Sequence, residues 1–438
     1  MDKDEIPTEE NAVPQQSLLE AILDRDNLRQ AWKRVRANKG APGMDGMSTL
    51  EFPSFARSQM PRVMEWIRQG RYKPSPVKRV WIPKPDGTQR PLGVPTVLDR
   101  VIQQAIAQVL GPLFEVDFSE SSFGFRPGRQ AKAAVERISE AAGEGYLWGV
   151  DCDLKSYFDM VNHDLLMHRL SQRVKDKMVL RLIGKYLRAG IRHEDGRAEK
   201  TTQGVPQGGP LSPLLANIML DPLDKRIEAM GLPFARYADD FLIVTKTKAE
   251  ALVAMAAVKD YVEGKLKLIV NEDKSKVAPI EECDFLGFNV RGRRIRRTDK
   301  AAKRFTFRIH EITSRSRGIS MRKRIGELQR YCRGWFHYFK TGLSFAEVRQ
   351  WDKWIRRRIR LCYWKDWKGP RNRRKMLIRL GASPKEVKKA TRSRKGYWRM
   401  SQNSIVRIAL NNAYLHQQGV PSMRDLWITF KYRDQAKL

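Results

Sequence analysis

The sequence predicts an α+β fold in which helices and short strands alternate up to about residue 290 and only helices follow. Two apolar stretches have the length of buried strands: residues 146–154 end in acid, and residues 234–244 are interrupted by two adjacent aspartates. Residues 249–266 carry an apolar stripe with i, i+3, i+4 spacing, which is typical of a helix. Helices that cross strands in this order favour an α+β domain, and the basic chain after Arg291 favours a separate helical one.

The N-terminal part of the chain combines helical segments with one hairpin. Residues 1–16 are polar and contain proline, so we expect them to lack a fixed structure. Residues 17–64 have helical periodicity that is broken by one glycine-rich loop. Residues 80–93 form a predicted hairpin with a Pro-Asp-Gly turn, which presents Lys84 and Arg90 on opposite arms. Further predicted helices cover residues 97–116, 130–142 and 161–187, and short strands are predicted at 268–270, 277 and 285–288.

Acidic residues gather at the two predicted central strands. Asp239 and Asp240 lie at the tip of a predicted hairpin, and Asp151 and Asp153 lie at the end of the earlier strand. Residues two apart in a strand share a face, so the pattern alone admits either Asp151 or Asp153 as the partner of the pair. Carboxylates held close together repel each other, and a divalent cation reverses this repulsion. Two strands that each deliver an aspartate to one point are typical of a two-metal phosphoryl-transfer site.

A glycine- and proline-rich loop lies between these strands. Residues 203–218 contain Gln207 and Gly208 and lead into an apolar helix. Glycine allows the backbone to approach a ligand closely, and a helix start favours phosphate groups. The loop is therefore a candidate for contact with a nucleotide.

The C-terminal third predicts two amphipathic helices, residues 319–341 and 345–367. Aromatic residues at helical spacing are core residues more often than base-stacking platforms, so we expect most of them to pack inside the domain. The lysines and arginines between them then face outward. The aromatic residues concerned are Trp335, Phe336, Tyr338, Phe339, Trp351, Trp354, Tyr363, Trp364 and Trp367.

Positive charge is concentrated in the same region. The whole chain has a net charge of +35, and residues 291–400 alone hold 37 Lys and Arg against 7 Asp and Glu. An excess of this size in a quarter of the chain indicates a polyanionic partner, whose phosphates release counterions on contact. A basic membrane-surface helix is disfavoured because the aromatic and basic residues are spread over many broken segments.

Several other functional classes are disfavoured by composition. The four cysteines stand far apart, so zinc sites and disulfides are not expected, and the six histidines show no metal-ligand spacing. No stretch reaches the roughly 18 apolar residues of a membrane helix, and the N-terminus is acidic rather than signal-like. We therefore expect a soluble cytoplasmic protein with no membrane partner.

Three motifs in order carry a family resemblance: the Ile-Pro-Lys-Pro-Asp-Gly hairpin, the Gln-Gly-Gly-Pro-Leu-Ser-Pro loop and Tyr-Ala-Asp-Asp. The chain resembles a bacterial group II intron reverse transcriptase/maturase from about Leu28 to its C-terminus. The resemblance implies a right-hand polymerase with fingers and palm over residues 17–290. It further implies an α-helical thumb, or maturase (X) domain, over 291–370 and a small basic DNA-binding domain over 371–438. The last part has neither the length nor the cysteine cluster of an HNH endonuclease domain, so none is expected.

The resemblance also implies roles for individual residues. Asp153 and Asp239 would ligate two Mg²⁺ ions, with the carbonyl of Leu154 as a further ligand and Asp240 completing the acidic cluster. The family pattern thus favours Asp153 over Asp151. The implied nucleotide-binding residues are Lys84, Arg90, Phe158, Gln207, Gly208 and Lys274, and the implied primer contacts are Phe285, Leu286, Gly287 and Phe288.

The function implied by the resemblance is RNA-directed DNA synthesis together with splicing. The partners would be intron RNA as template, a DNA target and primer strand, and deoxynucleoside triphosphates, with intron mobility by target-primed reverse transcription. Two alternatives share features of this sequence. A domesticated relative in DNA repair, phage defence or spacer acquisition would keep every polymerase motif, whereas a splicing cofactor that only binds RNA would not need the intact aspartates.

Overall fold

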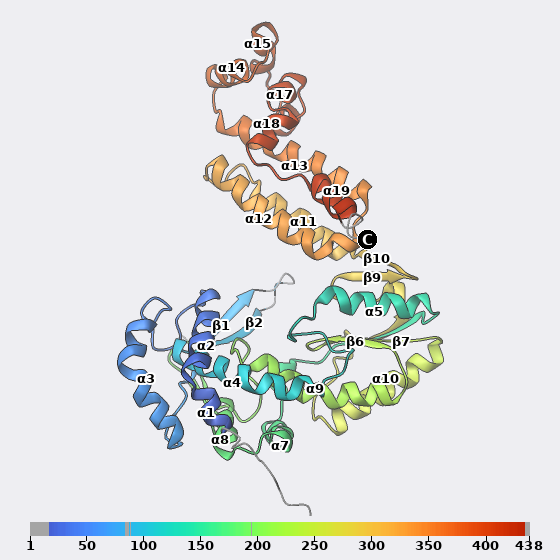
Figure 1. Cartoon of the computed structure of the whole chain (residues 1–438). Helices are drawn as coiled ribbons and strands as arrows, with labels where there is room; N and C mark the ends of the chain where they lie inside the picture. Colours follow the sequence, from blue (N-terminus) through green and yellow to red (C-terminus); the bar gives the residue numbers. More distant parts are fainter. Residues whose placement is uncertain (1–16, 84–86, 88, 194, 434–438) are drawn as a thin grey trace, which may run out of the picture. The chain divides into compact units, whose positions relative to one another are not determined.

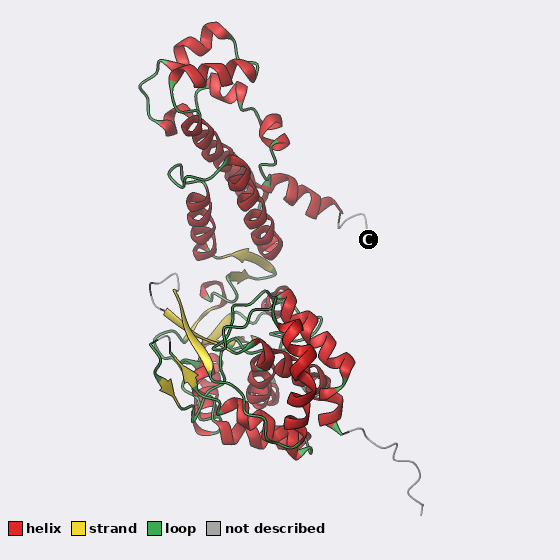
Figure 2. Ribbon diagram, turned by 90° about the vertical axis from the view of Figure 1, so that its left-hand side faces the viewer, coloured by secondary structure: helices red, strands yellow, loops and turns green. Residues whose placement is uncertain are grey.

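The computed structural model describes residues 17–433, except residues 84–86, 88 and 194. The predicted α+β class is confirmed. The chain divides into two compact units, Met1–Ile280 and Glu281–Leu438. The first unit contains strands and helices, and the second is almost entirely helical (Figures 1 and 2). The prediction for residues 1–16 lies outside the described residues.

An antiparallel sheet of four strands forms the centre of the first unit, in the order β6-β7-β3-β8. The inner strand β7 is buried from Phe241 to Thr245, which explains the continuous apolar run. Helix α5 packs on β6 and β7, and α10 packs on β3 and β8. The strands are β3 (Trp148–Cys152), β6 (Phe234–Tyr237), β7 (Asp240–Thr245) and β8 (Lys276–Pro279).

A second sheet holds the predicted hairpin, in the strand order β2-β1-β4-β5. Strand β1 pairs antiparallel with β2 and parallel with β4. The hairpin prediction is confirmed for its two arms. The strands are β1 (Val77–Pro83), β2 (Gln89–Val94), β4 (Ile191–Arg192) and β5 (Ala198–Glu199).

Several helices of the first unit begin after a side chain that accepts backbone hydrogen bonds, as N-caps do. Thr96 caps α4, Asp176 caps α8, and Thr247 forms a capping box at the start of α10. The Asp176 cap explains why the predicted helix over 161–187 is in fact two helices. The helices are α1 (Leu18–Leu23), α2 (Arg25–Ala37), α3 (Phe52–Arg68), α4 (Val97–Glu115), α5 (Ala131–Gly143), α6 (Tyr157–Met160), α7 (His163–Arg173), α8 (Lys177–Leu187), α9 (Ser212–Ala229) and α10 (Lys248–Gly264).

The second unit begins with a hairpin of two strands and continues as helices. Strand β9 (Phe288–Arg291) pairs antiparallel with β10 (Arg294–Arg297). Neither β10 nor α11 was predicted. The strand was missed because its sequence, Arg-Ile-Arg-Arg, has too few apolar residues to show a period. The short helix η1 (Ile280–Glu282) spans the division between the units. The helices that follow are α11 (Asp299–Ile312), α12 (Met321–Phe339), η2 (Lys340–Gly342), α13 (Phe345–Asp366), α14 (Pro370–Arg379), α15 (Pro384–Thr391), α16 (Tyr397–Met400), α17 (Ser404–Ala409), α18 (Asn412–Gln417) and α19 (Met423–Arg433).

One apolar core runs through the whole second unit, from Phe305 in α11 to Met423 in α19. The expectation that most aromatic residues of α12 and α13 are packing residues is confirmed, since Trp364 and Phe336 are fully buried. Tyr338 is the exception and is 43% exposed. The buried carboxylate of Asp352 accepts a hydrogen bond from the backbone N–H of Met423 at 2.6 Å, which ties α19 to α13. The predicted domain boundaries at residues 290 and 370 stay predictions.

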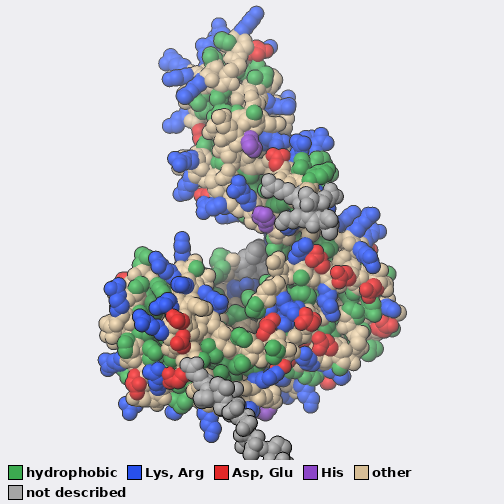
Figure 3. Space-filling view, viewed as in Figure 1, with side chains coloured by type: hydrophobic (Ala, Val, Ile, Leu, Met, Phe, Trp, Pro, Cys, Tyr) green, Lys and Arg blue, Asp and Glu red, His purple; other side chains and the backbone are tan. Residues whose placement is uncertain are grey.

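Basic side chains cover much of the visible surface of the second unit (Figure 3). This agrees with the charge excess over residues 291–400 in the sequence. The four cysteines are buried. Within residues 17–433, apart from the five undescribed positions, no helix is both long and apolar enough to cross a bilayer.

Candidate active site

The turn between β6 and β7 carries the first acidic residues of the site. Tyr237 pairs with Asp240 in the last register position, so Ala238 and Asp239 form the turn. Ala238 has a φ of +61°, in the left-handed region that side chains with a Cβ rarely adopt. Gly124 lies against this turn so closely that a Cβ there would come within 2.2 Å of the Ala238 nitrogen. The hairpin tip is therefore held in one conformation by packing.

Strand β3 brings Asp153 to the same end of the sheet. Cys152 is paired with Phe241 of β7, so Asp153 and Asp240 are the next residues beyond this pair, on neighbouring strands. Adjacent strands lie about 4.8 Å apart. Asn271 fixes Asp153 twice: its backbone N–H donates to the Asp153 carbonyl at 2.8 Å, and its Nδ2 donates to Oδ2 at 2.8 Å. The Asp153 N–H donates to the Ser275 hydroxyl at 3.0 Å.

Electrostatics link Asp153, Asp239 and Arg90. Burial raises the pKa of Asp239 above its ordinary value, and the Asp153 charge raises it further, whereas the charge of Arg90 lowers this pKa. The Lys274 ammonium lies 3.7 Å from Asp153 Oδ2. The structure therefore brings together four of the predicted site residues: two carboxylates, one guanidinium and one ammonium.

Asp151 lies in a different environment from Asp153. It is still within β3, opposite Leu242 on one side and Lys276 on the other. The charge of Asp153 raises the pKa of Asp239. This arrangement favours Asp153 as the partner of Asp239.

Arg236 was not predicted as a site residue, yet its side chain is hydrogen-bonded to the backbone of the turn. It is fully buried and forms an ion pair with the equally buried Asp224, at 2.5 Å. Its Nη1 also donates to the Ala238 carbonyl at 2.9 Å and to Asn217 Oδ1 at 3.0 Å. In the sequence, the signal for this residue is an arginine inside an apolar strand. Its partners Asp224 and Asn217 lie in α9, and the sequence alone does not identify them.

We expect Arg236→Ala to lower the free energy of unfolding by about 3–5 kcal/mol, because Asp224 would remain buried without a counter-charge. The turn that carries Asp239 should also lose support, since the Ala238 carbonyl loses its donor. Urea denaturation measures the change. The control is Arg236→Met combined with Asp224→Leu, which removes both charges and should cost clearly less. Equal losses in the single and double variants would contradict a role for the pair.

The glycine- and proline-rich loop packs against strand β2. The Gly93 N–H donates to the Gln207 carbonyl at 2.7 Å. Gly208 has a φ of +118°, and a Cβ there would lie 2.6 Å from the Gly93 carbonyl oxygen. The structure thus places Gln207 and Gly208 of the loop against β2, the strand that carries Arg90. The absence of a side chain at Gly208 permits this contact.

Phe158 lies in α6, shortly after Asp153 in the chain. It is half-buried, and its ring packs edge-on to the Tyr157 ring, with centroids 5.2 Å apart. Its carbonyl accepts a hydrogen bond from the Val205 N–H at 2.6 Å. The same loop that carries Gln207 therefore fixes the backbone of α6.

The remaining predicted residues are not placed at this site. Lys84 lies outside the described residues. The predicted primer contacts belong to the second unit, where Phe285 and Phe288 are buried at 4% and 2% exposure. Leu286 and Gly287 form a half-exposed turn whose carbonyls accept from the Tyr338 hydroxyl and the Thr298 N–H. The exposed part of this segment is therefore the Leu286–Gly287 turn and not the two phenyl rings.

The donor atoms fit a hard divalent cation. Among the described residues, no three His, Cys, Asp or Glu side chains form a ready-made metal site. Mg²⁺ does not require one, because it is commonly bound by one or two carboxylates together with water and substrate phosphates. Asp153 and Asp239 supply two such carboxylates, and Leu154 follows Asp153 directly.

Comparison with known families gives the decisive observation. Residues 82–290 match the family "Reverse transcriptase (RNA-dependent DNA polymerase)", and residues 302–381 match "Group II intron, maturase-specific domain". Protein YkfC of Escherichia coli (strain K12) is 32% identical over 321 residues, which cover 64% of this chain and 83% of that protein. The chain belongs to the group II intron reverse transcriptase/maturase family.

Two further similarities are weaker in coverage or in shape. The group II intron-encoded protein LtrA of Lactococcus lactis subsp. cremoris is 29% identical over 352 residues, covering 65% of this chain but only 58% of LtrA. One chain of the structure titled "Partial Cas6-RT-Cas1--Cas2 complex" has 28% sequence identity and a TM-score of 0.38, covering 58% of this chain and 44% of that chain. The chain contains a reverse transcriptase domain and a maturase domain, and members of such polymerase families are typically metal-dependent.

Proposed function

We propose that this group II intron reverse transcriptase extends a DNA primer on an RNA template, and that it also binds intron RNA to assist splicing and mobility. The observation that carries the proposal is the placement of Asp153 and Asp239 at one end of the central sheet, with the charge of Arg90 acting on Asp239. The family matches over residues 82–290 and 302–381 support the two halves of the function.

The proposed reaction is attack of a primer 3′-hydroxyl on the α-phosphorus of a deoxynucleoside triphosphate, with release of pyrophosphate. Two Mg²⁺ ions bound at these carboxylates would supply the charge that activates the hydroxyl and stabilises the departing oxygens. Asp153, the Leu154 carbonyl, Asp239 and Asp240 would hold them. Asn271 keeps Asp153 oriented before substrate arrives, through both of its hydrogen bonds.

The other residues would bind substrates. Arg90 is exposed on β2, and its charge lowers the pKa of Asp239. We therefore assign Arg90, together with Lys84, to binding of the triphosphate. Gln207 and Gly208 would line the nucleotide, and Phe158 would contact the sugar. Lys274 would donate a proton to pyrophosphate. The Leu286–Gly287 turn would contact the primer.

Primer extension by the full-length chain on an RNA template tests the polymerase part. We expect DNA synthesis that requires Mg²⁺ and stops on chelation. Self-splicing of a precursor RNA built from the sequence that flanks the gene tests the maturase part, and the protein should accelerate it. Extension without effect on that RNA would favour a domesticated reverse transcriptase, and splicing without extension would favour an RNA-binding cofactor.

We propose that the last helices bind the DNA target through their basic surface. Replacing the exposed residues Arg371, Arg374 and Lys375 of α14 by glutamine should reduce the slope of log Kd for DNA against log salt by about three, since each phosphate contact contributes roughly one. Extension of a preformed primer-template should persist. Deleting residues after Gly369 is a poor alternative, because it removes the buried Met423 from the core. An unchanged slope would place this face outside the DNA contact.

A further inference from the structure

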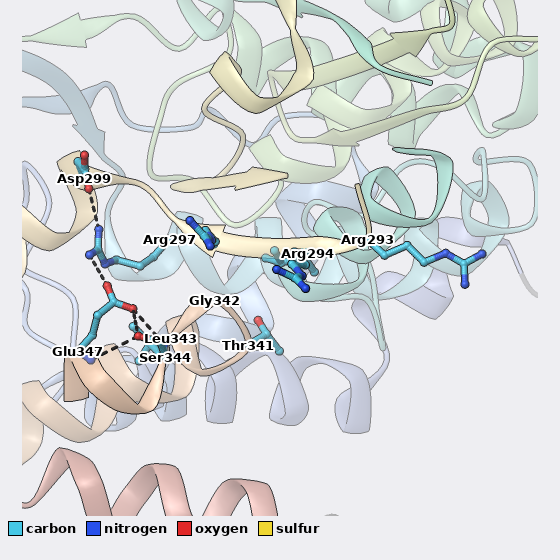
Figure 4. Close-up of a pocket in the computed structure, with 11 residues that line it drawn as sticks. Arg293, Arg294, Arg297, Asp299, Thr341, Gly342, Leu343, Ser344 and Glu347 are labelled. Atoms are coloured by element: carbon cyan, nitrogen blue, oxygen red, sulfur yellow. Dashed lines mark hydrogen bonds and ion pairs between the residues drawn. The ribbon is translucent and has the colours of Figure 1, made fainter. Parts of the chain in front are cut away.

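A cavity of about 580 Å³ lies within the second unit, between strand β10 and the start of helix α13. One wall is formed by residues 293–297 and the other by residues 341–344 together with Glu347 (Figure 4). Both walls belong to the same unit. The reaction assigned above uses none of these residues, so the cavity has no role in that chemistry.

The two walls are fixed against each other by a close backbone contact. A Cβ at Gly342 would lie 2.7 Å from the Arg297 nitrogen, so only glycine allows the turn before α13 to approach β10. The Trp427 indole N–H donates to the Leu343 carbonyl at 3.1 Å, which ties the same turn to α19. The cavity is therefore a fixed feature of this unit.

Arg297 is committed to holding this arrangement together. It forms ion pairs with Asp299, at 3.0 Å, and with Glu347, and both are drawn in Figure 4. Glu347 in turn accepts from the Ser344 N–H at 3.0 Å and hydroxyl at 2.8 Å, closing the capping box of α13. The start of α13 is thus already occupied by its own carboxylate. Both acidic residues of the cavity, Asp299 and Glu347, form ion pairs with Arg297, and Glu347 also caps the start of α13.

Three further arginines, one directly before β10 and two within it, are not neutralised. Arg293, Arg294 and Arg296 are exposed, and within the described part of the chain none of them forms an ion pair. Arg294 lies beside β10 on the side of the 341–344 turn, and Arg293 extends beyond the start of the strand (Figure 4). Like charges held on one short strand repel each other, and an anion between them removes that repulsion.

We propose that this cavity binds phosphodiester groups of a nucleic-acid strand, through Arg293, Arg294 and Arg296. Arginine presents a planar fork of donors that matches phosphate oxygens. Arg294 and Arg296 are two apart on β10 and so are spaced by about 6.6 Å, a separation that suits an extended polyanion better than one small ion. The proposal deepens the proposed function, because it rests on a nucleic-acid substrate and gives one strand of that substrate a fixed contact in the second unit.

The first test measures binding of a labelled RNA–DNA primer-template to the full-length protein across a range of salt, without nucleotides. Arg293→Ala, Arg294→Ala and Arg296→Ala together should weaken binding by about tenfold or more and reduce the salt slope by about two to three. Arg297 stays intact in this variant, so the cavity walls keep their contacts. The control replaces Lys300, Lys303 and Arg304 of α11, three exposed cations outside the cavity, by alanine. An equal loss in the control would overturn the proposal, since general charge would explain it.

The second test neutralises the phosphates instead of the protein and needs only the wild-type chain to fold. A single methylphosphonate is moved along each strand of the duplex. One or two positions should weaken binding to wild type, and the same positions should have no effect on the triple variant. The strand that carries these positions identifies RNA or DNA as the ligand. A flat scan, or the same losses in both proteins, would overturn the proposal.

Two further measurements separate this proposal from its rivals and from the proposed function. If pyrophosphate displaced the duplex from wild type but not from the triple variant, the cavity would be a site for free phosphate compounds and the proposal would fail. At saturating duplex the triple variant should extend primers at the wild-type rate, with only the KM for duplex raised. A wild-type chain that binds as described but extends nothing would refute the polymerase function and leave this contact standing.

Discussion

Replacing both Asp239 and Asp240 by asparagine is expected to abolish primer extension on RNA while nucleic-acid binding survives. Asparagine keeps the size of each side chain but removes the negative charge that a divalent cation requires. Metal ions supply several kcal/mol of charge stabilisation in phosphoryl transfer, and each 1.4 kcal/mol corresponds to about tenfold in rate. We therefore expect a loss of about a thousandfold or more. Single-nucleotide incorporation under pre-steady-state conditions measures it, and filter binding checks the affinity for template.

The matched control for this result is Asp151→Asn, which removes a carboxylate from the same sheet within β3. Because Asp151 lies within β3, opposite Leu242 and Lys276, whereas the Asp153 charge raises the pKa of Asp239, the control should stay within about tenfold of wild type. Asp153→Asn should behave like the double variant. Near-normal extension by the double variant would end the polymerase assignment. Loss of activity in Asp151→Asn but not in Asp153→Asn would make Asp151 the metal ligand in place of Asp153.

The acidic residues could be found in the sequence because strand patterns are local. An apolar run on each side of Asp239 and Asp240 predicts a buried hairpin, and the Phe241 to Thr245 burial agrees with it. The partners that orient these carboxylates could not be found in the same way. Asn271 reaches Asp153 from a turn more than a hundred residues later, and the ion pair between Arg236 and Asp224 joins a strand to a helix. Such contacts depend on tertiary approach, which no local period encodes.

In the second unit, too, elements with a clear sequence period could be predicted and those without one could not. Helices α12 and α13 were predicted because their aromatic and aliphatic residues recur with helical spacing, and their burial follows. Strand β10 was missed because its only apolar residue is Ile295, and pairing with β9 rather than pattern makes it a strand. The predicted primer residues Phe285 and Phe288 were assigned by resemblance, whereas their burial leaves the turn between them as the accessible part.

Phe158→Ala is expected to relax the choice between deoxyribonucleotides and ribonucleotides. Phe158 lies five residues after Asp153 and is half-buried, with its backbone fixed by Val205. If its ring lies under the sugar, a 2′-hydroxyl collides with it, and a close-packed pocket has little room to relax. Removing the ring should raise ribonucleotide incorporation relative to deoxyribonucleotide incorporation by about ten- to a hundredfold, at about tenfold for each ~1.4 kcal/mol of relieved clash.

The alternative role for Phe158 is packing, and the neighbouring residue provides the comparison. Tyr157 is 2% exposed and its hydroxyl donates to the Ala216 carbonyl at 2.8 Å, so Tyr157→Phe perturbs the core without opening the nucleotide side. It should cost about 1 kcal/mol of stability and leave the ribo/deoxyribo ratio unchanged. A purely structural Phe158 would instead lose up to about 3–5 kcal/mol on truncation and use both nucleotides less well. Measuring kcat/KM for both nucleotides beside the melting temperature decides between them: a folded Phe158→Ala with the wild-type ratio removes the residue from the site, because steric selection would then reside elsewhere.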